Sequence, residues 1–360
     1  MNSTPNPTRL SLAIVGLSFG RHILNDLHRK PTSDLFQLAA VCDLQKKVAD
    51  ELAASHGVKA YYSLDEVLAD DSIAVVGLYT QPRGRAELLR KIIRAGKDVM
   101  TTKPFELDSA EAESVLREAQ KLGRVIHLNS PGPKLSPDLE QIQTWVKEFD
   151  LGRLVAVRGD VWANYFEKAD GTWMDDAKLC PGGAMMRLGI YLINDIVDLA
   201  GSIDRIDLIS SRVRTGRPTP DNAILTMSCA GGCLASVYAS FCVEDGDHYS
   251  NGLILNYERG TVYRNVGGFS LAPRQHGAAN LSLVKQEESV RRVVAEKVFH
   301  ECSGLYQWEN LVRAITNRES IDDGYVERIV QGVKILETMG KISTVPQITV
   351  VPPITVVKSA

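Results

Sequence analysis

The first third of the chain alternates short apolar runs with amphipathic helical patterns. The apolar runs are rich in β-branched residues and comprise Leu10–Val15, Phe36–Cys42, Ile73–Tyr79, Asp98–Thr101 and Val125–Leu128. Strands that alternate with helices form βαβ units, whose strands pair in parallel because each crossover returns the chain to the same end of the sheet. This order predicts an α/β fold that begins with a doubly wound, Rossmann-type parallel sheet.

The pattern changes after Asn129. A cluster of helix breakers, Ser130-Pro-Gly-Pro133, marks a candidate boundary. Residues 206–265 hold strand-like runs joined by Gly, Asn and Asp turns without interleaved helices, which is typical of an antiparallel sheet. Helices are expected at 137–149, 183–199, 304–317 and 323–340. The predicted organisation is a Rossmann domain at 1–130, a second α/β domain with a large, open, mostly antiparallel sheet at 131–345, and a tail at 346–360.

Composition excludes several classes of partner. The formal net charge of −3 gives no reason to expect nucleic acid or a membrane surface. Apolar runs stay well short of the roughly 20 residues that span a bilayer, and the first residues do not resemble a signal peptide, so we expect a cytoplasmic protein. The six cysteines form no CxxC pair, which favours buried thiols over disulfides or a metal site.

The first predicted strand–helix turn reads Ala13-Ile-Val-Gly16-Leu-Ser18-Phe19-Gly20-Arg21. A dinucleotide-binding turn needs glycine at the bend, at the approach to the pyrophosphate and where helix meets strand. Gly16 fits the first role, Ser18 replaces the second glycine, and Gly20 precedes the usual third position by one residue. The turn follows a strand and opens a helix, whose N-terminus favours a phosphate. We therefore predict that Gly16, Ser18, Phe19 and Gly20 contact the cofactor.

Asp43 ends the second predicted strand. An acidic residue there accepts hydrogen bonds from the adenosine ribose and repels a 2′-phosphate, so NAD is the expected cofactor. Lys46 and Lys47 leave NADP possible, because either side chain can reach such a phosphate. The alternative is that Asp43 only caps the following helix.

Three further segments carry a family resemblance. Leu78-Tyr-Thr80-Gln-Pro82 and Gly96-Lys-Asp-Val-Met-Thr-Thr102-Lys103-Pro104 each end a strand, and Gly182-Gly-Ala-Met-Met-Arg187-Leu-Gly189-Ile-Tyr191 opens a helix. In this order they resemble the glucose–fructose oxidoreductase/inositol dehydrogenase/MocA family over nearly the whole chain. The resemblance implies NAD(P)-dependent oxidation or reduction of sugars and cyclitols, with Thr80, Pro82 and Lys103 at the cofactor. It also implies a homo-oligomer, a dimer or tetramer, built through the open sheet.

The chain departs from the family pattern at several positions. The family's Glu-Lys-Pro motif appears as Thr102-Lys103-Pro104, which keeps the lysine and loses the acid. Arg187 stands where the family commonly has aspartate, and Tyr191 where it commonly has histidine. Glucose–fructose oxidoreductase and dihydrodiol dehydrogenase look similar in carrying a tyrosine at that place. Arg85 stands where a histidine is often found.

Lys103 and Tyr191 are the candidates for proton transfer. Oxidising a carbinol requires a base for the hydroxyl proton, while the nicotinamide takes the hydride. We expect Tyr191 to act as acid/base, with tyrosinate favoured by Lys103 and the oxidised nicotinamide, and Lys103 to polarise the reacting oxygen. The two roles can also be exchanged.

Other residues are candidates for the substrate pocket. Arg187 and Tyr191 are four residues apart on a predicted helix and so share a face. If Arg187 lines the pocket, it favours an anionic substrate such as a sugar acid; the alternative is a structural ion pair. Asn194, Trp162 and Tyr165 are the remaining predicted substrate contacts, although aromatic residues of this kind are as often core.

Three functions fit these observations. The first is an NAD(P)-dependent dehydrogenase or reductase acting on a CH–OH group of a sugar, cyclitol or sugar acid. The second is a non-catalytic nicotinamide-binding regulator, suggested by the loss of the family's aspartate and histidine. The third is an enzyme that uses a tightly bound NAD transiently for glycoside elimination or epimerisation.

Overall fold

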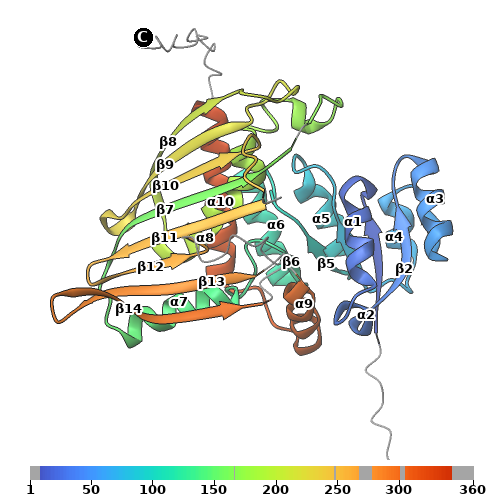
Figure 1. Ribbon diagram of the computed structural model, residues 1–360. Helices are drawn as coiled ribbons and strands as arrows, with labels where there is room; N and C mark the ends of the chain where they lie inside the picture. Colours follow the sequence, from blue (N-terminus) through green and yellow to red (C-terminus); the bar gives the residue numbers. More distant parts are fainter. Residues whose placement is uncertain (1–8, 166, 247–248, 267–277, 301–304, 343–360) are drawn as a thin grey trace, which may run out of the picture.

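The computed structural model describes residues 9–165, 167–246, 249–266, 278–300 and 305–342. These residues form two sheets with helices packed on them (Figure 1). The predicted tail at 346–360 lies outside the described residues. Within the described ranges, no helix is long and apolar enough to cross a membrane.

The first sheet is parallel throughout and has six strands in the order β3-β2-β1-β4-β5-β6. Its strands are β1 (Leu10–Val15), β2 (Phe36–Cys42), β3 (Lys59–Tyr61), β4 (Val75–Leu78), β5 (Asp98–Thr101) and β6 (Ile126–Leu128). β1 pairs with both β2 and β4, so the strand order reverses beside it. In open α/β sheets a ligand crevice forms at that point, outside the carboxyl ends of the strands.

The helices that connect these strands cover both faces of the sheet. They are α1 (Leu17–Leu27), α2 (Thr32–Leu35), α3 (Lys46–His56), α4 (Leu64–Ala69), α5 (Arg85–Arg94) and α6 (Ser109–Leu122). Gly57 and Gly123 end α3 and α6 in the left-handed conformation. The predicted Rossmann fold is thereby confirmed, with the short elements α2 and β3 added.

The second sheet has eight strands in the order β14-β13-β12-β11-β7-β10-β9-β8. Its strands are β7 (Leu154–Ala163), β8 (Ile203–Ser211), β9 (Asn222–Cys229), β10 (Leu234–Ser240), β11 (Tyr249–Tyr257), β12 (Gly260–Arg264), β13 (Ala279–Glu287) and β14 (Val290–Phe299). All pairs are antiparallel except β7 with β10. The mostly antiparallel sheet predicted from the sequence is confirmed, and the hairpin β13–β14 extends it.

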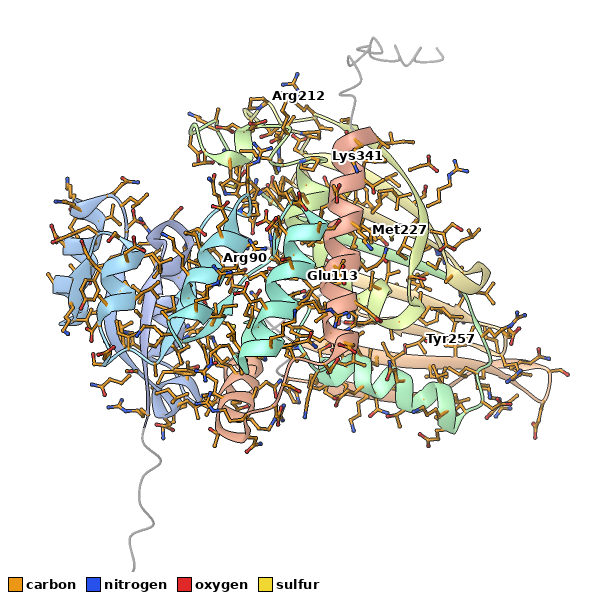
Figure 2. The ribbon with its side chains drawn as sticks, turned by 180° about the vertical axis from the view of Figure 1, so that it is seen from behind. Arg90, Glu113, Arg212, Met227, Tyr257 and Lys341 are labelled. Atoms are coloured by element: carbon orange, nitrogen blue, oxygen red, sulfur yellow. The ribbon has the colours of Figure 1, made fainter. Side chains whose placement is uncertain are left out.

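Helices pack on one face of the second sheet. They are α7 (Pro137–Glu148), the π-helix η2 (Met185–Gly189), α8 (Ile190–Ala200) and part of α10 (Asp323–Ile342). Figure 1 looks onto the strands with α8 and α10 behind them, and Figure 2, from the opposite side, shows α10 in front. The other face of the sheet carries no helix of the described chain.

Two C-terminal helices return to the Rossmann sheet. Trp308 and Leu311 of α9 (Leu305–Asn317) join the core around Leu12. α10 packs between the two layers, because Val326 and Ile329 contact the Rossmann core while Leu336 and Met339 contact the second core. The division at 1–130 and 131–345 stays a prediction, and the later segment contributes directly to the core of the earlier one.

The element boundaries differ from prediction near the site. α1 begins at Leu17, directly after the glycine turn. The helix predicted at 183–199 is divided into a π-helix and α8. A 3.6-residue pattern cannot reveal this wider turn, because the apolar face continues through it.

Candidate active site

The turn between β1 and α1 requires glycine. Gly16 has a φ of +87°, which L side chains rarely adopt, and an added Cβ would lie 2.8 Å from the Tyr79 carbonyl oxygen. Gly20 packs on the strand, where a Cβ would meet Ile14 Cγ2 at 2.8 Å. Sharp bending and close helix–strand packing are two of the glycine roles in a dinucleotide-binding turn.

The first turn of α1 presents the remaining predicted cofactor contacts. Ser18 is exposed, and Phe19 is 44% exposed with its ring 5.8 Å from that of Tyr79. Gly16 supplies no side-chain cap to the helix. The start of a helix is the positive end of its dipole, which favours a phosphate.

Asp43 lies beside this turn. Its Oδ2 accepts a hydrogen bond from Leu17 N at 2.8 Å, and its Oδ1 accepts one from Gln45 N at 2.9 Å. The helix that follows is capped at Gln45, so Asp43 is not its N-cap residue. Each carboxylate oxygen keeps a second lone pair, which leaves acceptor capacity for a ribose diol.

The two lysines that follow Asp43 have other partners. Lys46 Nζ lies 5.0 Å from the centre of the Tyr62 ring, and Lys47 Nζ lies 3.9 Å from Glu51 on the same helix. Each of the two side chains thus makes a contact within its own part of the Rossmann domain.

The segment after β4 is fastened to the segment after β5 by Arg85. This guanidinium, 2% exposed, donates hydrogen bonds to the carbonyl oxygens of Thr80, Thr102 and Pro104. Pro82 is buried, and its carbonyl accepts a hydrogen bond from Arg85 N. Arg85 therefore fixes the two loops that carry the predicted cofactor contacts Thr80, Pro82 and Lys103.

Thr80 also carries a buried polar atom suited to a ligand. Its Oγ1 has no hydrogen-bond partner within the described residues. Its backbone nitrogen would lie 3.1 Å from a Cβ at Gly16, which places it at the reversal of strand order. An unpaired buried hydroxyl is costly unless a ligand satisfies it. The turn, Asp43 and Thr80 together fit a dinucleotide.

Lys103 and Tyr191 lie together, although one follows a strand of the first sheet and the other belongs to a helix packed on the second sheet. Lys103 follows β5, and its Nζ donates a 2.6 Å hydrogen bond to the Arg187 carbonyl oxygen in the π-helix. The same Nζ lies 4.5 Å from the centre of the Tyr191 ring, at the start of α8. The structure thus brings the carboxyl edge of the Rossmann sheet against the helix of the second domain.

Burial sets the protonation of both groups. Burial, together with the positive charge of Arg187, lowers the pKa of the Lys103 ammonium from 10.5 to about 7. Burial raises the pKa of the Tyr191 hydroxyl, with Tyr249 and Tyr165 adding to the effect. Stabilisation of tyrosinate by Lys103 is therefore not what the structure favours, since the lysine lies over the ring and desolvation dominates.

Arg187 forms a two-pronged ion pair. Its Nη2 donates to Glu167 Oε1 at 2.6 Å, its Nη1 donates to Glu167 Oε2, and its guanidinium lies 4.6 Å from the centre of the Phe241 ring. Arg217 Nε also donates to Glu167 Oε2, at 2.8 Å. Of the two interpretations open at the sequence level, the structure shows the ion pair.

The other predicted substrate residues lie in different places. Tyr165 is 41% exposed and stacks on Phe241 at 5.2 Å, next to Arg187. Trp162 alternates with the inward-facing Val161 and Ala163, so it lies on the sheet face opposite α8, where its Nε1 donates to Asp245. Asn194 is 4% exposed and donates to Ser130 Oγ at 3.1 Å. Tyr165 thus lies near enough to act electrostatically on Tyr191, whereas the contacts of Trp162 and Asn194 are with other residues.

Sequence reasoning missed Glu167 and Tyr249. Glu167 follows an aromatic segment with no motif around it, and only its contact with Arg187 reveals a role. Tyr249 begins β11 and acts electrostatically on Tyr191, while Asp195, one turn along α8, pairs with Arg264 at 2.7 Å. These residues converge through the fold, and their spacing in the chain carries no signal.

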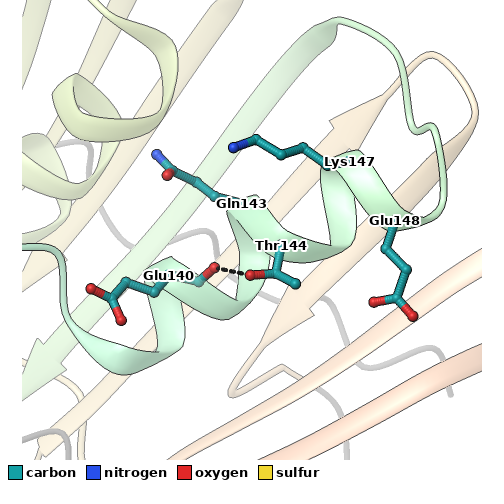
Figure 3. A pocket seen from close by; sticks show the side chains of 5 residues that line it. All are labelled: Glu140, Gln143, Thr144, Lys147 and Glu148. Carbon is teal, nitrogen blue, oxygen red and sulfur yellow. Dashed lines mark hydrogen bonds between the residues drawn. The ribbon is translucent and has the colours of Figure 1, made fainter.

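A shallow hollow on α7 lies apart from these residues (Figure 3). It is lined by the polar side chains Glu140, Gln143, Thr144, Lys147 and Glu148. The Thr144 hydroxyl donates to the Glu140 carbonyl of its own helix. None of these residues belongs to the candidate site.

A Rossmann sheet with this turn, joined to an open sheet whose helix meets the Lys-Pro loop, defines a two-domain dinucleotide-binding protein. Residues 10–130 match the model described as "Oxidoreductase family, NAD-binding Rossmann fold", and residues 139–263 match the GFO/IDH/MocA C-terminal domain. The chain belongs to the GFO/IDH/MocA oxidoreductase family.

Relatives of known name are distant. Trans-1,2-dihydrobenzene-1,2-diol dehydrogenase of Oryctolagus cuniculus is 26% identical over 219 residues, which are 60% of this chain and 63% of that protein. The chain thus spans less than two thirds of the length of this curated relative. Sequence similarity at this level covers the family's shared framework rather than a shared substrate.

Solved structures share the fold over most of their length. The aldose–aldose oxidoreductase from Caulobacter crescentus, complexed with glycerol, superposes with a TM-score of 0.70 at 20% identity, covering 93% of this chain and 97% of the other. Levoglucosan dehydrogenase in complex with NADH gives a TM-score of 0.70 at 16% identity, covering 92% and 98%. These likenesses establish the fold that the chain shares with them.

Proposed function

We propose that this protein is an NAD-dependent oxidoreductase that transfers hydride to or from a CH–OH carbon of a sugar, cyclitol or related diol. The observation that carries the proposal is the position of Lys103 Nζ. It lies at the carboxyl edge of the Rossmann sheet, against Tyr191 and the Arg187 carbonyl. A proton-transferring group there is adjacent to the crevice where a nicotinamide binds in this fold.

The residues present fit a dinucleotide. Gly16, Ser18, Phe19 and Gly20 would hold the pyrophosphate at the start of α1, and Asp43 would accept the ribose hydroxyls. Thr80, Pro82 and Lys103 would border the nicotinamide half. When bound, the cofactor accepts or donates the hydride.

Lys103 is the better candidate for the acid/base. Tyr191 would then remain a neutral hydroxyl beside it. A general base works best when its pKa lies near the working pH, and burial lowers the pKa of Lys103 to about 7. During alcohol oxidation the hydroxyl proton passes to the neutral Lys103 amine as hydride leaves the carbon and the C=O bond forms. In the reverse direction the Lys103 ammonium returns the proton.

The ion pair favours a neutral substrate. Both terminal nitrogens of Arg187 are bound to Glu167, and a sugar acid would have to displace that carboxylate. Dihydrodiol dehydrogenase and levoglucosan dehydrogenase are named for uncharged compounds. Neutral polyols and diols are therefore the first substrates to screen, with sugar acids as the comparison.

Cofactor binding provides the first test. Fluorescence titration should show that wild-type protein binds NADH in preference to NADPH, and that Asp43→Ala relaxes this discrimination by removing the carboxylate that repels a 2′-phosphate. Asp65→Ala is the matched control, because Asp65 is an exposed carboxylate on α4 that pairs only with Lys91 among the described residues. Absence of binding by either dinucleotide would overturn the proposal.

Turnover separates the alternatives. Reduction of added NAD by a neutral polyol, abolished in Lys103→Met, is the expected result. The non-catalytic regulator, suggested by the loss of the family's aspartate and histidine, predicts binding without any turnover. Transient redox with a retained cofactor predicts product formation without net change in free NADH.

A further inference from the structure

The π-helix presents a backbone carbonyl to Lys103. In an α-helix, the carbonyl of Arg187 would point along the axis toward the N–H group four residues on. Residues Met185–Gly189 form a π-helix instead, and the Arg187 carbonyl accepts a 2.6 Å hydrogen bond from Lys103 Nζ. Single π-turns within helices are often found at functional sites. The wider turn thus fixes the position of Lys103 Nζ.

The Arg187 side chain acts electrostatically on the same lysine and is held by two neighbours. Glu167 binds both terminal nitrogens of the guanidinium, and the Phe241 ring packs on it at 4.6 Å. Glu167 is itself held by Arg217, which is 6% exposed and also contacts Asp170 and Asp175. These contacts hold the Arg187 guanidinium in place, while the Glu167 carboxylate offsets part of its positive charge.

The charged and titratable groups that act on Lys103 come from three elements. Arg187 contributes a positive charge from the π-helix, Tyr191 contributes a ring from α8, and the buried Cys180 thiol precedes the π-helix. Burial raises the pKa of the Cys180 thiol and that of the Tyr191 hydroxyl, so both are neutral. Among the described residues, no carboxylate forms an ion pair with Lys103.

We propose that Arg187, fixed by Glu167, is a positioning residue that keeps Lys103 as a neutral amine aimed at the substrate hydroxyl. The inference rests on the proposed function and extends it, because a lysine without a counter-charge beside a fixed cation is ready to accept a proton. The carbonyl of Arg187 orients Nζ, and its guanidinium disfavours the ammonium form. The resting site is then prepared for alcohol oxidation, in which Lys103 takes the hydroxyl proton.

The test is a direct titration of Lys103 in the full-length protein. Lysine labelled with ¹³C at the ε-carbon gives one NMR signal per lysine, and loss of a signal in Lys103→Arg assigns it. In wild-type protein we expect this signal to titrate with a pKa of about 7. Arg187→Met keeps the backbone carbonyl and removes the side-chain charge. In this variant the pKa of Lys103 should rise by about one pH unit or more.

Two further variants act as controls. Arg187→Lys keeps a positive charge and should leave the Lys103 titration near its wild-type position. Arg94→Met removes an arginine that forms a similar two-pronged pair with Glu118 on the surface, and should change nothing at Lys103. The rising limb of kcat/KM for oxidation should shift with the NMR titration, which a purely structural role would not produce.

The outcomes separate this inference from the proposed function. An unshifted Lys103 titration in Arg187→Met, or an equal shift in Arg187→Lys, would overturn the inference even if Lys103 supports turnover. A shifted titration with no turnover of any polyol would overturn the proposed function alone. If Arg187→Met fails to fold, Arg187→Gln removes the charge while keeping hydrogen bonds to Glu167, and the same shift is expected.

Discussion

His127 lies on β6 and is fully buried. Its exposure is 0%, its Nδ1 lies 3.0 Å from the Leu128 carbonyl, and its Nε2 has no partner within the described residues. Burial lowers the pKa of His127 from 6.5 to about 3. The folded protein therefore holds this imidazole neutral at pH values where the unfolded chain protonates it.

The stability of the protein should accordingly fall in acid. Between pH 6.5 and 3 the unfolded state binds one more proton at His127, so the free energy of unfolding drops as the pH falls, by up to about 1.4 kcal/mol per pH unit. Urea unfolding followed by tryptophan fluorescence at several pH values measures this slope. His127→Leu should flatten it, whereas His300→Leu, at an exposed histidine, should not. Equal slopes in wild type and His127→Leu would contradict the prediction.

At the scale of single residues, the sequence predicts those whose role depends on where they stand relative to the nearest strand or helix. Gly16 and Asp43 follow strands, and their positions near the start of α1 were predicted from that order. Lys103 and Tyr191 were selected through family resemblance, and the structure places Lys103 Nζ 4.5 Å from the centre of the Tyr191 ring. The partner of Arg187 could not be predicted, because Glu167 reaches it through a loop whose path depends on tertiary contacts.

The loop before the π-helix is anchored by one side chain. Arg217 contacts Glu167, Asp170 and Asp175, with nitrogen–oxygen distances between 2.7 and 2.9 Å. A backbone bridge between Lys168 and Gly216 runs alongside. These contacts hold the segment that carries Glu167 against the helix that carries Arg187.

Arg217→Met should loosen this loop. Removing the guanidinium leaves three carboxylates without their shared cation, and hydrogen bonds to charged groups contribute about 1.5–3 kcal/mol each, so unfolding should become easier by about 2 kcal/mol or more. Hydrogen–deuterium exchange should rise locally over residues 167–176. Arg205→Met is the control, since Arg205 pairs with Asp207 in an exposed position on β8. Unchanged exchange over the loop would show that the ion pairs do not anchor it.

Whole elements were predictable where their periodicity is strong and their ends are marked. The strands predicted at Leu10–Val15, Phe36–Cys42 and Asp98–Thr101 agree with the structure. The three-residue strand β3 and the one-turn helix α2 have too few residues to show a period. The π-helix was missed because its side chains continue the apolar face of α8.

At the scale of the molecule, the face of the second sheet that carries no helix of the described chain has an exposed apolar row. Ile209, Ile224 and Tyr238 are register neighbours on β8, β9 and β10. The residues that adjoin them along β9 and β10 belong to the core under the helices. Ile209 is 73% exposed and Ile224 is 45% exposed. A contiguous exposed apolar row on a broad sheet is typical of an interface.

We expect a second copy of the chain to cover this face, giving a dimer or tetramer. Sedimentation velocity should show the oligomer for wild-type protein, and Ile224→Lys should dissociate it, because a lysine at the centre of the row would be buried without a partner. The isolated fold should tolerate the change, since position 224 is exposed within one chain. Leu122→Lys at the end of α6 is a matched control, because Leu122 is also 45% exposed but lies on the Rossmann domain. A monomeric wild type, or an oligomer unaffected by Ile224→Lys, would show that this face has another role.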